Sequence, residues 1–181
     1  MKFETFKNWL NERAAERLEY ACLMLGADIP DWKKRISIVK PEDIYKEGDD
    51  YGYEKEPHVT IIYGLHYEEI NTEEICDHIK VLFPITATID TISIFETEQG
   101  YDVVKYDVPL TKDLKEYRQF FERFYPNTQT YKEYHPHMTI AYVKTGEGKK
   151  YAQKVKPFEV NFNKAIYSSP DEQKRIFDLS E

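Results

Sequence analysis

Two short stretches of this sequence repeat one another, and this repeat constrains the fold more than any other feature. The stretch at 56–64 reads Glu-Pro-His-Val-Thr-Ile-Ile-Tyr-Gly, and the stretch at 135–143 reads His-Pro-His-Met-Thr-Ile-Ala-Tyr-Val. Pro, His, Thr, Ile and Tyr occur at the same offsets, and each copy follows a polar loop. The copies lie 79 residues apart, which indicates a duplicated lobe rather than a short solenoid repeat.

Each copy is rich in β-branched residues and is predicted to be a strand that begins at the histidine. Residues i and i+2 of a strand point to the same face, so His58 projects together with Thr60, and His137 projects together with Thr139. If an approximate two-fold axis relates the two lobes, the two pairs face each other across a cleft. Two imidazoles and two hydroxyls then surround one bound group.

A phosphate ester suits that arrangement. The hydroxyls of Thr60 and Thr139 donate to non-bridging oxygens, and each imidazole addresses one reacting oxygen. Because imidazole titrates near neutrality, one of His58 and His137 can be neutral while the other is protonated. The neutral one accepts a proton from a ribose 2′-hydroxyl that attacks phosphorus, and the protonated one donates to the departing 5′-oxygen. The sequence leaves open which histidine has which role. We expect no metal and no cofactor.

Two other interpretations of these histidines stay open. The first is structural, because a single His-x-Thr on a strand is usually a half-buried histidine bonded to a neighbour; the matched pair favours catalysis. The second takes His135 and His137, perhaps with His58, as metal ligands. No Asp, Glu or Cys stands near them in a recognisable ligand pattern, and Glu56 occupies the position of His135 in the first copy.

The rest of the chain predicts alternating helices and strands. Three- and four-residue apolar steps favour a helix over 3–25, which includes Cys22 and ends at Gly26. Other helices are expected from the caps Asn71 and Thr111, the first of them through Leu82. The first motif strand is expected to end at Gly64. Further strands are predicted at 85–95, 101–108, 137–143, 158–168 and 173–179. This order indicates an α+β domain with antiparallel sheets.

Composition narrows the function. The chain has 181 residues, which suits one domain, 1–181, made of two halves. A net charge of −8 argues against binding long nucleic acid, which needs a basic surface, but not against a small phosphorylated ligand. Cys22 and Cys76 have no partner at ligand spacing and are expected to be free thiols. No segment has the length of a membrane span, so we expect a cytoplasmic protein. We also expect no obligate protein partner.

The two motif strands, Pro57-His58-Val59-Thr60 and Pro136-His137-Met138-Thr139, resemble those of the two-histidine phosphoesterase superfamily. This superfamily includes bacterial RNA ligase-like and cyclic phosphodiesterase enzymes. The resemblance implies a bilobal fold of two pseudo-symmetric antiparallel-sheet lobes with outer helices and a central cleft. It also implies metal-independent catalysis by His58, Thr60, His137 and Thr139.

Within that superfamily, the compact chain looks most like the phage anti-CBASS phosphodiesterases, which degrade cyclic oligonucleotide signals of the host. The features are the expected N-terminal helix with residues 19–24, the Tyr63-Gly64 end of the first motif and a composition rich in Lys and Glu. The resemblance implies substrate-binding roles for Tyr20 and, more speculatively, Tyr167, for which core packing is the alternative. Alternative functions are processing of RNA ends or 2′,3′-cyclic phosphates, and sequestration of a nucleotide without cleavage.

Overall fold

The computed structural model describes residues 19–47, 51–129 and 133–179. They form an α+β fold. The strands are β1 (Tyr20–Ala27), β2 (His58–His66), β3 (Ile85–Glu96), β4 (Tyr101–Asp107), β5 (His137–Lys144), β6 (Gln153–Ser168) and β7 (Lys174–Asp178). The helices are α2 (Trp32–Ile36), α3 (Thr72–Lys80) and α4 (Lys112–Phe124), with short 3₁₀ helices at Pro41–Asp43, Tyr67–Glu69 and Gly148–Tyr151.

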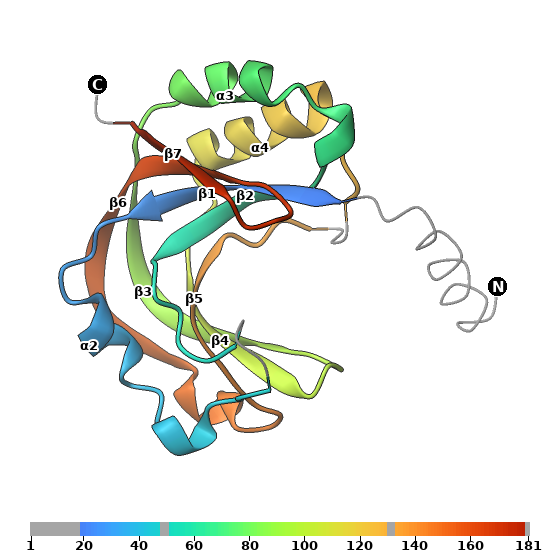
Figure 1. Ribbon diagram of the computed structural model, residues 1–181. Coiled ribbons are helices and arrows are strands. Elements are labelled where there is room, and N and C mark those ends of the chain that lie inside the picture. Colours follow the sequence, from blue (N-terminus) through green and yellow to red (C-terminus); the bar gives the residue numbers. More distant parts are fainter. Residues whose placement is uncertain (1–18, 48–50, 130–132, 180–181) are drawn as a thin grey trace.

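All seven strands belong to one antiparallel sheet, in the order β2-β1-β6-β3-β4-β5 with β7 beside β6. The predicted pair of separate lobe sheets is therefore not what the structure shows. The reason is β6, a 16-residue strand that pairs with β3 along its first part and with β1 along its last part. Figure 1 shows this strand running along the curved sheet.

The helices cover the sheet at different places. α4 contacts β2, α3 contacts β6 and β7, and α2 contacts β5; α3 and α4 lie side by side in Figure 1. Both predicted caps are present, because Asn71 accepts hydrogen bonds from the Glu73 and Glu74 amides and Thr111 accepts one from the Leu114 amide. Each cap thus supplies an acceptor for amides that the first turn of the helix leaves unpaired.

The predicted helix over 3–25 is wrong where the structure describes it. Residues 20–27 form β1, in which Cys22 also lies, and 1–18 lie outside the described residues. Along β1 the buried side chains alternate, as at Ala21, Leu23 and Leu25, which is the period of a strand between two others. Gly26 is not a helix cap but pairs with His58 within the sheet.

Strand β2 continues past Gly64 to His66, contrary to the predicted end. Gly64 has φ +91° and forms an irregularity in the pairing with β1, where Cys22 pairs with Tyr63 and Ala21 with Leu65. A glycine at such a position lets a strand bulge and resume. The strands predicted at 85–95 and 101–108 are confirmed as β3 and β4, and those predicted at 158–168 and 173–179 correspond to β6 and β7.

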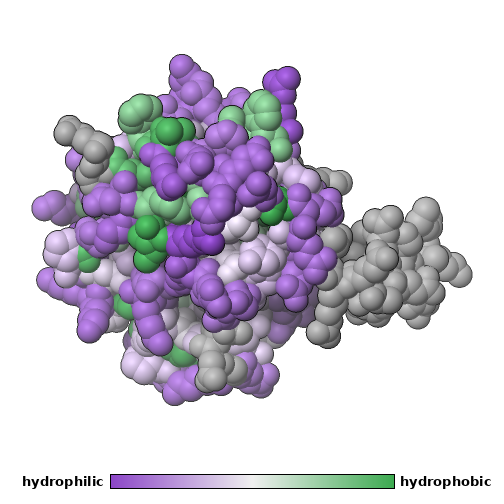
Figure 2. All heavy atoms as spheres, turned by 45° about the horizontal axis from the view of Figure 1, so that its top comes forward, coloured by the Kyte–Doolittle hydropathy of each residue, from purple (hydrophilic) through white to green (hydrophobic). Residues whose placement is uncertain are grey.

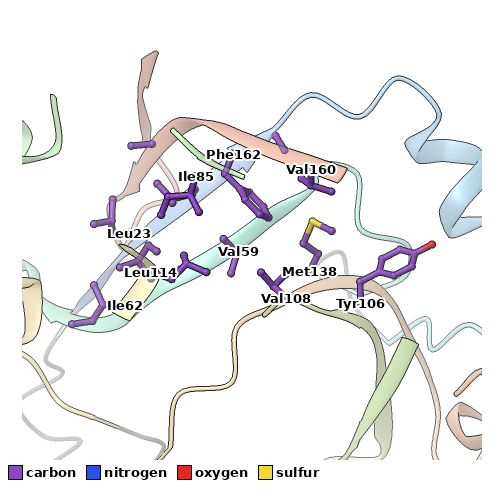
Figure 3. Packing of buried hydrophobic residues seen from close by; sticks show 14 of the residues in the cluster. Leu23, Val59, Ile62, Ile85, Tyr106, Val108, Leu114, Met138, Val160 and Phe162 are labelled. Atoms are coloured by element: carbon purple, nitrogen blue, oxygen red, sulfur yellow. The ribbon is translucent and has the colours of Figure 1, made fainter. Parts of the chain in front are cut away.

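The core lies on the face of the sheet opposite the motif threonines. Val59 and Ile61 of β2 and Met138 and Ile140 of β5 are fully buried. Figure 3 shows Val59 lying toward Met138 and Val108. β2 and β5 also contact one another, although they stand at opposite ends of the strand order. This packing brings the two copies of the repeat together.

The surface is mainly hydrophilic. In the view of Figure 2, hydrophobic residues form small scattered groups among hydrophilic ones. Within residues 19–47, 51–129 and 133–179, no helix combines the length and apolar character needed to cross a membrane.

Candidate active site

Strand β2 presents His58 and Thr60 on one face of the sheet. Their cross-strand partners are Gly26 and Met24 of β1, and such partners share a face. The Nδ1 atom of His58 lies 2.8 Å from the Glu56 carbonyl oxygen. A carbonyl only accepts, so Nδ1 carries the hydrogen, and Nε2 of the neutral ring is left as the basic atom. We call the face that bears His58 the motif face.

Strand β5 repeats this geometry. The Nδ1 atom of His137 lies 2.8 Å from the His135 carbonyl oxygen, which fixes the same tautomer as in His58. Asp107 pairs with His137 and Lys105 pairs with Thr139 across β4 and β5. Two residues on opposite edges of the sheet therefore offer the same ring nitrogen for proton transfer.

The two motif strands also share a bulge. The pairing of β2 with β1 skips Ile61, and the pairing of β5 with β4 skips Ile140, which is the equivalent residue. Both carbonyls that the bulges free have partners: Ile61 accepts from Arg118 at 3.1 Å, and Ile140 accepts from the Glu54 amide at 3.0 Å. A bulge re-aims the side chains that follow it, so the equivalence extends beyond the four-residue motif.

The two pairs are held near each other by contacts between β2 and the segment before β5. The Tyr134 hydroxyl donates to the Thr60 carbonyl at 2.7 Å. The Arg118 guanidinium lies 4.5 Å from the centre of the Tyr134 ring. His58 and His137 are close enough that the charge of His58 lowers the pKa of His137. The structure thus brings His58, Thr60, His137 and Thr139 into one site.

The two threonines have different surroundings. Thr139 is 9% exposed and lies beside Lys105. The Thr60 side chain is hydrogen-bonded to Cys22, whose thiol pKa burial raises to about 12 despite that bond. A thiol with so high a pKa stays protonated and is a poor nucleophile. Cys22 and Cys76 are both free cysteines, as predicted.

Lys105 is a site residue that the sequence did not reveal. The residue is 4% exposed, and its Nζ donates to Ser93 Oγ at 2.7 Å and to Asp107 Oδ1 at 2.6 Å. The ammonium also lies 4.2 Å from the centre of the Phe95 ring, which packs edge-on against His137 at 5.0 Å. The only signal in the sequence is a lysine within the apolar run of 101–108.

Electrostatics at His137 follow from these neighbours. Burial lowers the pKa of the His137 ring, and the positive charges of Lys105 and His58 lower it further. The hydrogen bond with the His135 carbonyl and the charge of Asp107 act in the opposite direction. The balance favours the neutral imidazole, which is the form that accepts a proton.

Aromatic side chains lie on the motif face at both ends of the site. On β1 and β2, Tyr20 packs against Tyr63 and His66 with ring centres 6.0 Å apart in each pair, and Tyr63 is 50% exposed. On β4 and β5, Tyr101 and Tyr142 pack together at 5.5 Å. Register places Tyr63 with Cys22, and Tyr142 with Val103, on the same face as the motif threonines. The predicted residue Tyr20 is therefore on the motif face.

Tyr167 is placed differently. It pairs with Leu23, on the core face of β1, and is 1% exposed. A side chain so placed packs in the core and does not meet a ligand on the motif face. Its position corresponds to the core-packing alternative, because the two-residue alternation of β6 directs Ile166 and Ser168, not Tyr167, to the motif face.

Two hollows adjoin the site. One, of about 510 Å³, is lined partly by Phe95, Lys105 and Asp107 beside the second motif. The other, of about 230 Å³, is lined partly by Glu56, Tyr142 and Lys174. Both combine aromatic side chains with charged groups of both signs.

The alternative of a metal bound by His135 and His137 finds no ligand cluster in the described parts of the chain. No group of three or more His, Cys, Asp or Glu side chains is placed there to hold an ion. His135 is exposed and lies 3.3 Å from Glu133. The interpretation of His58 and His137 as a pair rests on their matched tautomers.

Residues 30–163 match a protein family that is described as the 2′-5′ RNA ligase superfamily. The matched range includes both motif strands and Lys105. The chain belongs to the 2′-5′ RNA ligase superfamily. This confirms the predicted superfamily of two-histidine phosphoesterases, to which enzymes acting on phosphodiester bonds belong.

No match was found among curated proteins. Among solved structures, a similar chain is described as "Crystal structure of phosphoesterase"; it is 15% identical with a TM-score of 0.46, and the alignment covers 88% of this chain and 95% of that one.

Proposed function

We propose that this protein is a phosphodiesterase that cleaves 3′–5′ linkages of small cyclic oligonucleotides through a 2′,3′-cyclic phosphate. The observation that carries the proposal is the pair of matched imidazoles. His58 and His137 hold Nδ1–H on a backbone carbonyl and leave Nε2 for chemistry. Membership of a phosphoesterase superfamily supports a phosphate ester as the group that lies between them.

The reaction balances with these two residues alone. One Nε2 accepts the proton of the ribose 2′-hydroxyl while the oxygen bonds to phosphorus; the other, protonated, donates to the 5′-oxygen as its bond to phosphorus breaks. Thr60 and Thr139 supply hydroxyl donors for the non-bridging oxygens. General acid–base catalysis of this kind contributes roughly 10²- to 10⁴-fold in rate. In a second step, water opens the 2′,3′-cyclic phosphate with the two roles exchanged.

The surface near the site supports a small substrate with bases. Tyr63 with Tyr20, and Tyr142 with Tyr101, offer aromatic rings on both sides of the His-Thr pairs, and stacking on an aromatic ring contributes roughly 1–3 kcal/mol per base. A net charge of −8 disfavours long nucleic acid. We propose the cytoplasm as the location and, as the biological setting, removal of a cyclic nucleotide signal of CBASS defence by a phage.

A panel of substrates tests the proposal. Cyclic dinucleotides, linear 3′–5′ dinucleotides and 2′,3′-cyclic nucleotides are incubated with the protein, and the products are resolved by chromatography. We expect the cyclic dinucleotides to be cut fastest, with a transient 2′,3′-cyclic phosphate. Preference for 2′,3′-cyclic nucleotides would favour the RNA-processing alternative. Tight binding without any product would favour sequestration. The double variant His58→Ala/His137→Ala is the control for a contaminating nuclease.

A further inference from the structure

The two His-Thr pairs match in sequence, tautomer and bulge, but their neighbouring strands do not match. Next to Thr139 stands Lys105, whereas next to Thr60 stands Met24. Next to His137 stands Asp107, whereas next to His58 stands Gly26. The second motif therefore has a buried cation, Lys105, beside its threonine. An apolar side chain, Met24, occupies the equivalent position beside the first motif.

Lys105 is held where it stands by a complete set of contacts. Ser93 and Asp107 bind its ammonium, and the Phe95 ring lies beneath it and against His137. At 4% exposure, water screens this charge little. A cation so placed opposes a second positive charge on the His137 ring.

The surroundings of His58 are different. The nearby carboxylate is that of Glu56, which pairs with Lys174 of β7 at 2.8 Å, and Lys164 of β6 lies further off. The pKa of Glu56 is lowered, mainly by Lys174 and in smaller part by His58. Around His137 the charged groups are Lys105, Asp107 and His58. Each histidine thus has an ion pair nearby, but the cation of the His137 pair, Lys105, is buried, whereas Asp107 and both members of the His58 pair are more exposed to solvent.

From this asymmetry we propose that Lys105 assigns the roles of the two histidines: His137 is the general base of the first step, and His58 is the general acid. His137 Nε2 accepts the 2′-hydroxyl proton as the 2′-oxygen bonds to phosphorus. His58 donates its proton to the 5′-oxygen as the phosphorus–oxygen bond breaks. Lys105 is a positioning residue that acts through His137. This inference rests on the proposed function.

A change of leaving group separates the two roles. Adenosine 3′-(4-nitrophenyl phosphate) releases a stable phenolate and needs no acid, whereas the dinucleoside ApA releases an alkoxide that does. We expect His58→Ala to lose about 10²-fold or more on ApA but less than about tenfold on the nitrophenyl ester. We expect His137→Ala to lose about 10²-fold or more on both. The reverse pattern, or equal losses for both variants on both substrates, would overturn the assignment.

The variant Lys105→Met tests the role of Lys105. Methionine is chosen because Met24 pairs with Thr60 in the first motif as Lys105 pairs with Thr139 in the second. On the nitrophenyl ester, the acidic limb of the pH profile should move to higher pH, because His137 then protonates more readily. A move of about one unit corresponds to about a tenfold drop in rate well below the limb. Lys105→Arg should restore the limb, and Lys154→Met, at an exposed lysine, should leave it unmoved.

An unmoved limb in folded Lys105→Met would refute the role of Lys105, even if the rate fell at every pH. If Lys105→Met does not fold, the neutral variant Lys105→Gln takes its place in the same pH profile, and the histidine variants still test which histidine is the base. If the wild-type protein cleaves none of ApA, the nitrophenyl ester and a cyclic dinucleotide, both the proposed function and this inference are refuted. Wild-type protein that cuts them with the wrong variant pattern would sink this inference alone.

Discussion

Replacing Gly64 by alanine tests the geometry that carries strand β2 past the first motif. Gly64 has φ +91°, and a Cβ added there would overlap the Thr128 carbonyl oxygen and lie 3.3 Å from its carbonyl carbon. Both atoms belong to the backbone, so relief requires the 127–129 segment to move away. The Thr128 amide also donates to the Gly64 carbonyl at 2.9 Å, and that bond is lost with the movement.

The magnitude follows from three contributions. A positive φ costs an alanine roughly 1–2 kcal/mol, and the lost hydrogen bond contributes about 1 kcal/mol. Displacement of the segment that also pairs Asn127 with Leu65 adds about 1–2 kcal/mol. Gly64→Ala should therefore lower the free energy of unfolding by about 3–5 kcal/mol.

The matched control is Gly146→Ala. Gly146 has φ +86°, but no described atom lies within 4 Å of its added Cβ. It should incur only the backbone cost of roughly 1–2 kcal/mol. Urea denaturation, followed by circular dichroism, measures the free energy of unfolding of both variants. Thermal denaturation measures their Tm. In a chain of this size, a difference of about 2–3 kcal/mol amounts to roughly 4–12 °C in Tm. Equal losses for the two variants would refute the close approach of Thr128 to Gly64.

Four further outcomes are expected. His58→Ala and His137→Ala should each remove about 10²- to 10⁴-fold of turnover on a dinucleotide, and the double variant should be scarcely slower, because the two act in one transfer; additive losses would contradict that, and a Tm within a few degrees of wild type excludes unfolding. Thr139→Val should lower kcat by about 10-fold or more with little change in KM, since a phosphate donor is lost; an unchanged kcat would remove Thr139 from the site. Activity should survive excess EDTA, and its loss with recovery on adding zinc or manganese would favour the His135/His137 metal alternative. Tyr167→Phe should stabilise the fold by about 1 kcal/mol, because its buried hydroxyl lacks a partner among the described residues. Tyr125→Phe should destabilise the fold, because it removes a hydrogen bond with His78. Equal shifts in Tm for the two variants would refute this contrast.

Local geometry could be predicted from the sequence better than the order of the strands in the sheet. His58 and Thr60, like His137 and Thr139, are two residues apart on a strand, so their shared face follows from local geometry alone. The capped helices α3 and α4 were predictable for the same reason. Local patterns are read directly from the chain, because the interacting residues are neighbours in it.

The features that could not be predicted depend on contacts between segments that are distant in the sequence. Residues 20–25 have apolar steps that fit a helix, but β2 and β6 pair with them on both sides and make them a strand. The two expected lobe sheets are one, because a single long strand, β6, pairs with both halves. The role proposed for Lys105 depends on the register of β4 against β5. No pattern in one sequence fixes these pairings.

The central claim, that His58 and His137 drive attack by a neighbouring 2′-hydroxyl, is tested most directly by removing that hydroxyl. A ribose cyclic dinucleotide and its all-deoxy counterpart are compared for binding by calorimetry and for cleavage by chromatography, at equal protein concentration. We predict similar binding, cleavage of the ribose compound through a 2′,3′-cyclic phosphate, and no cleavage of the deoxy compound. Hydrolysis of the deoxy compound at a comparable rate would contradict the mechanism, even if both histidines proved essential.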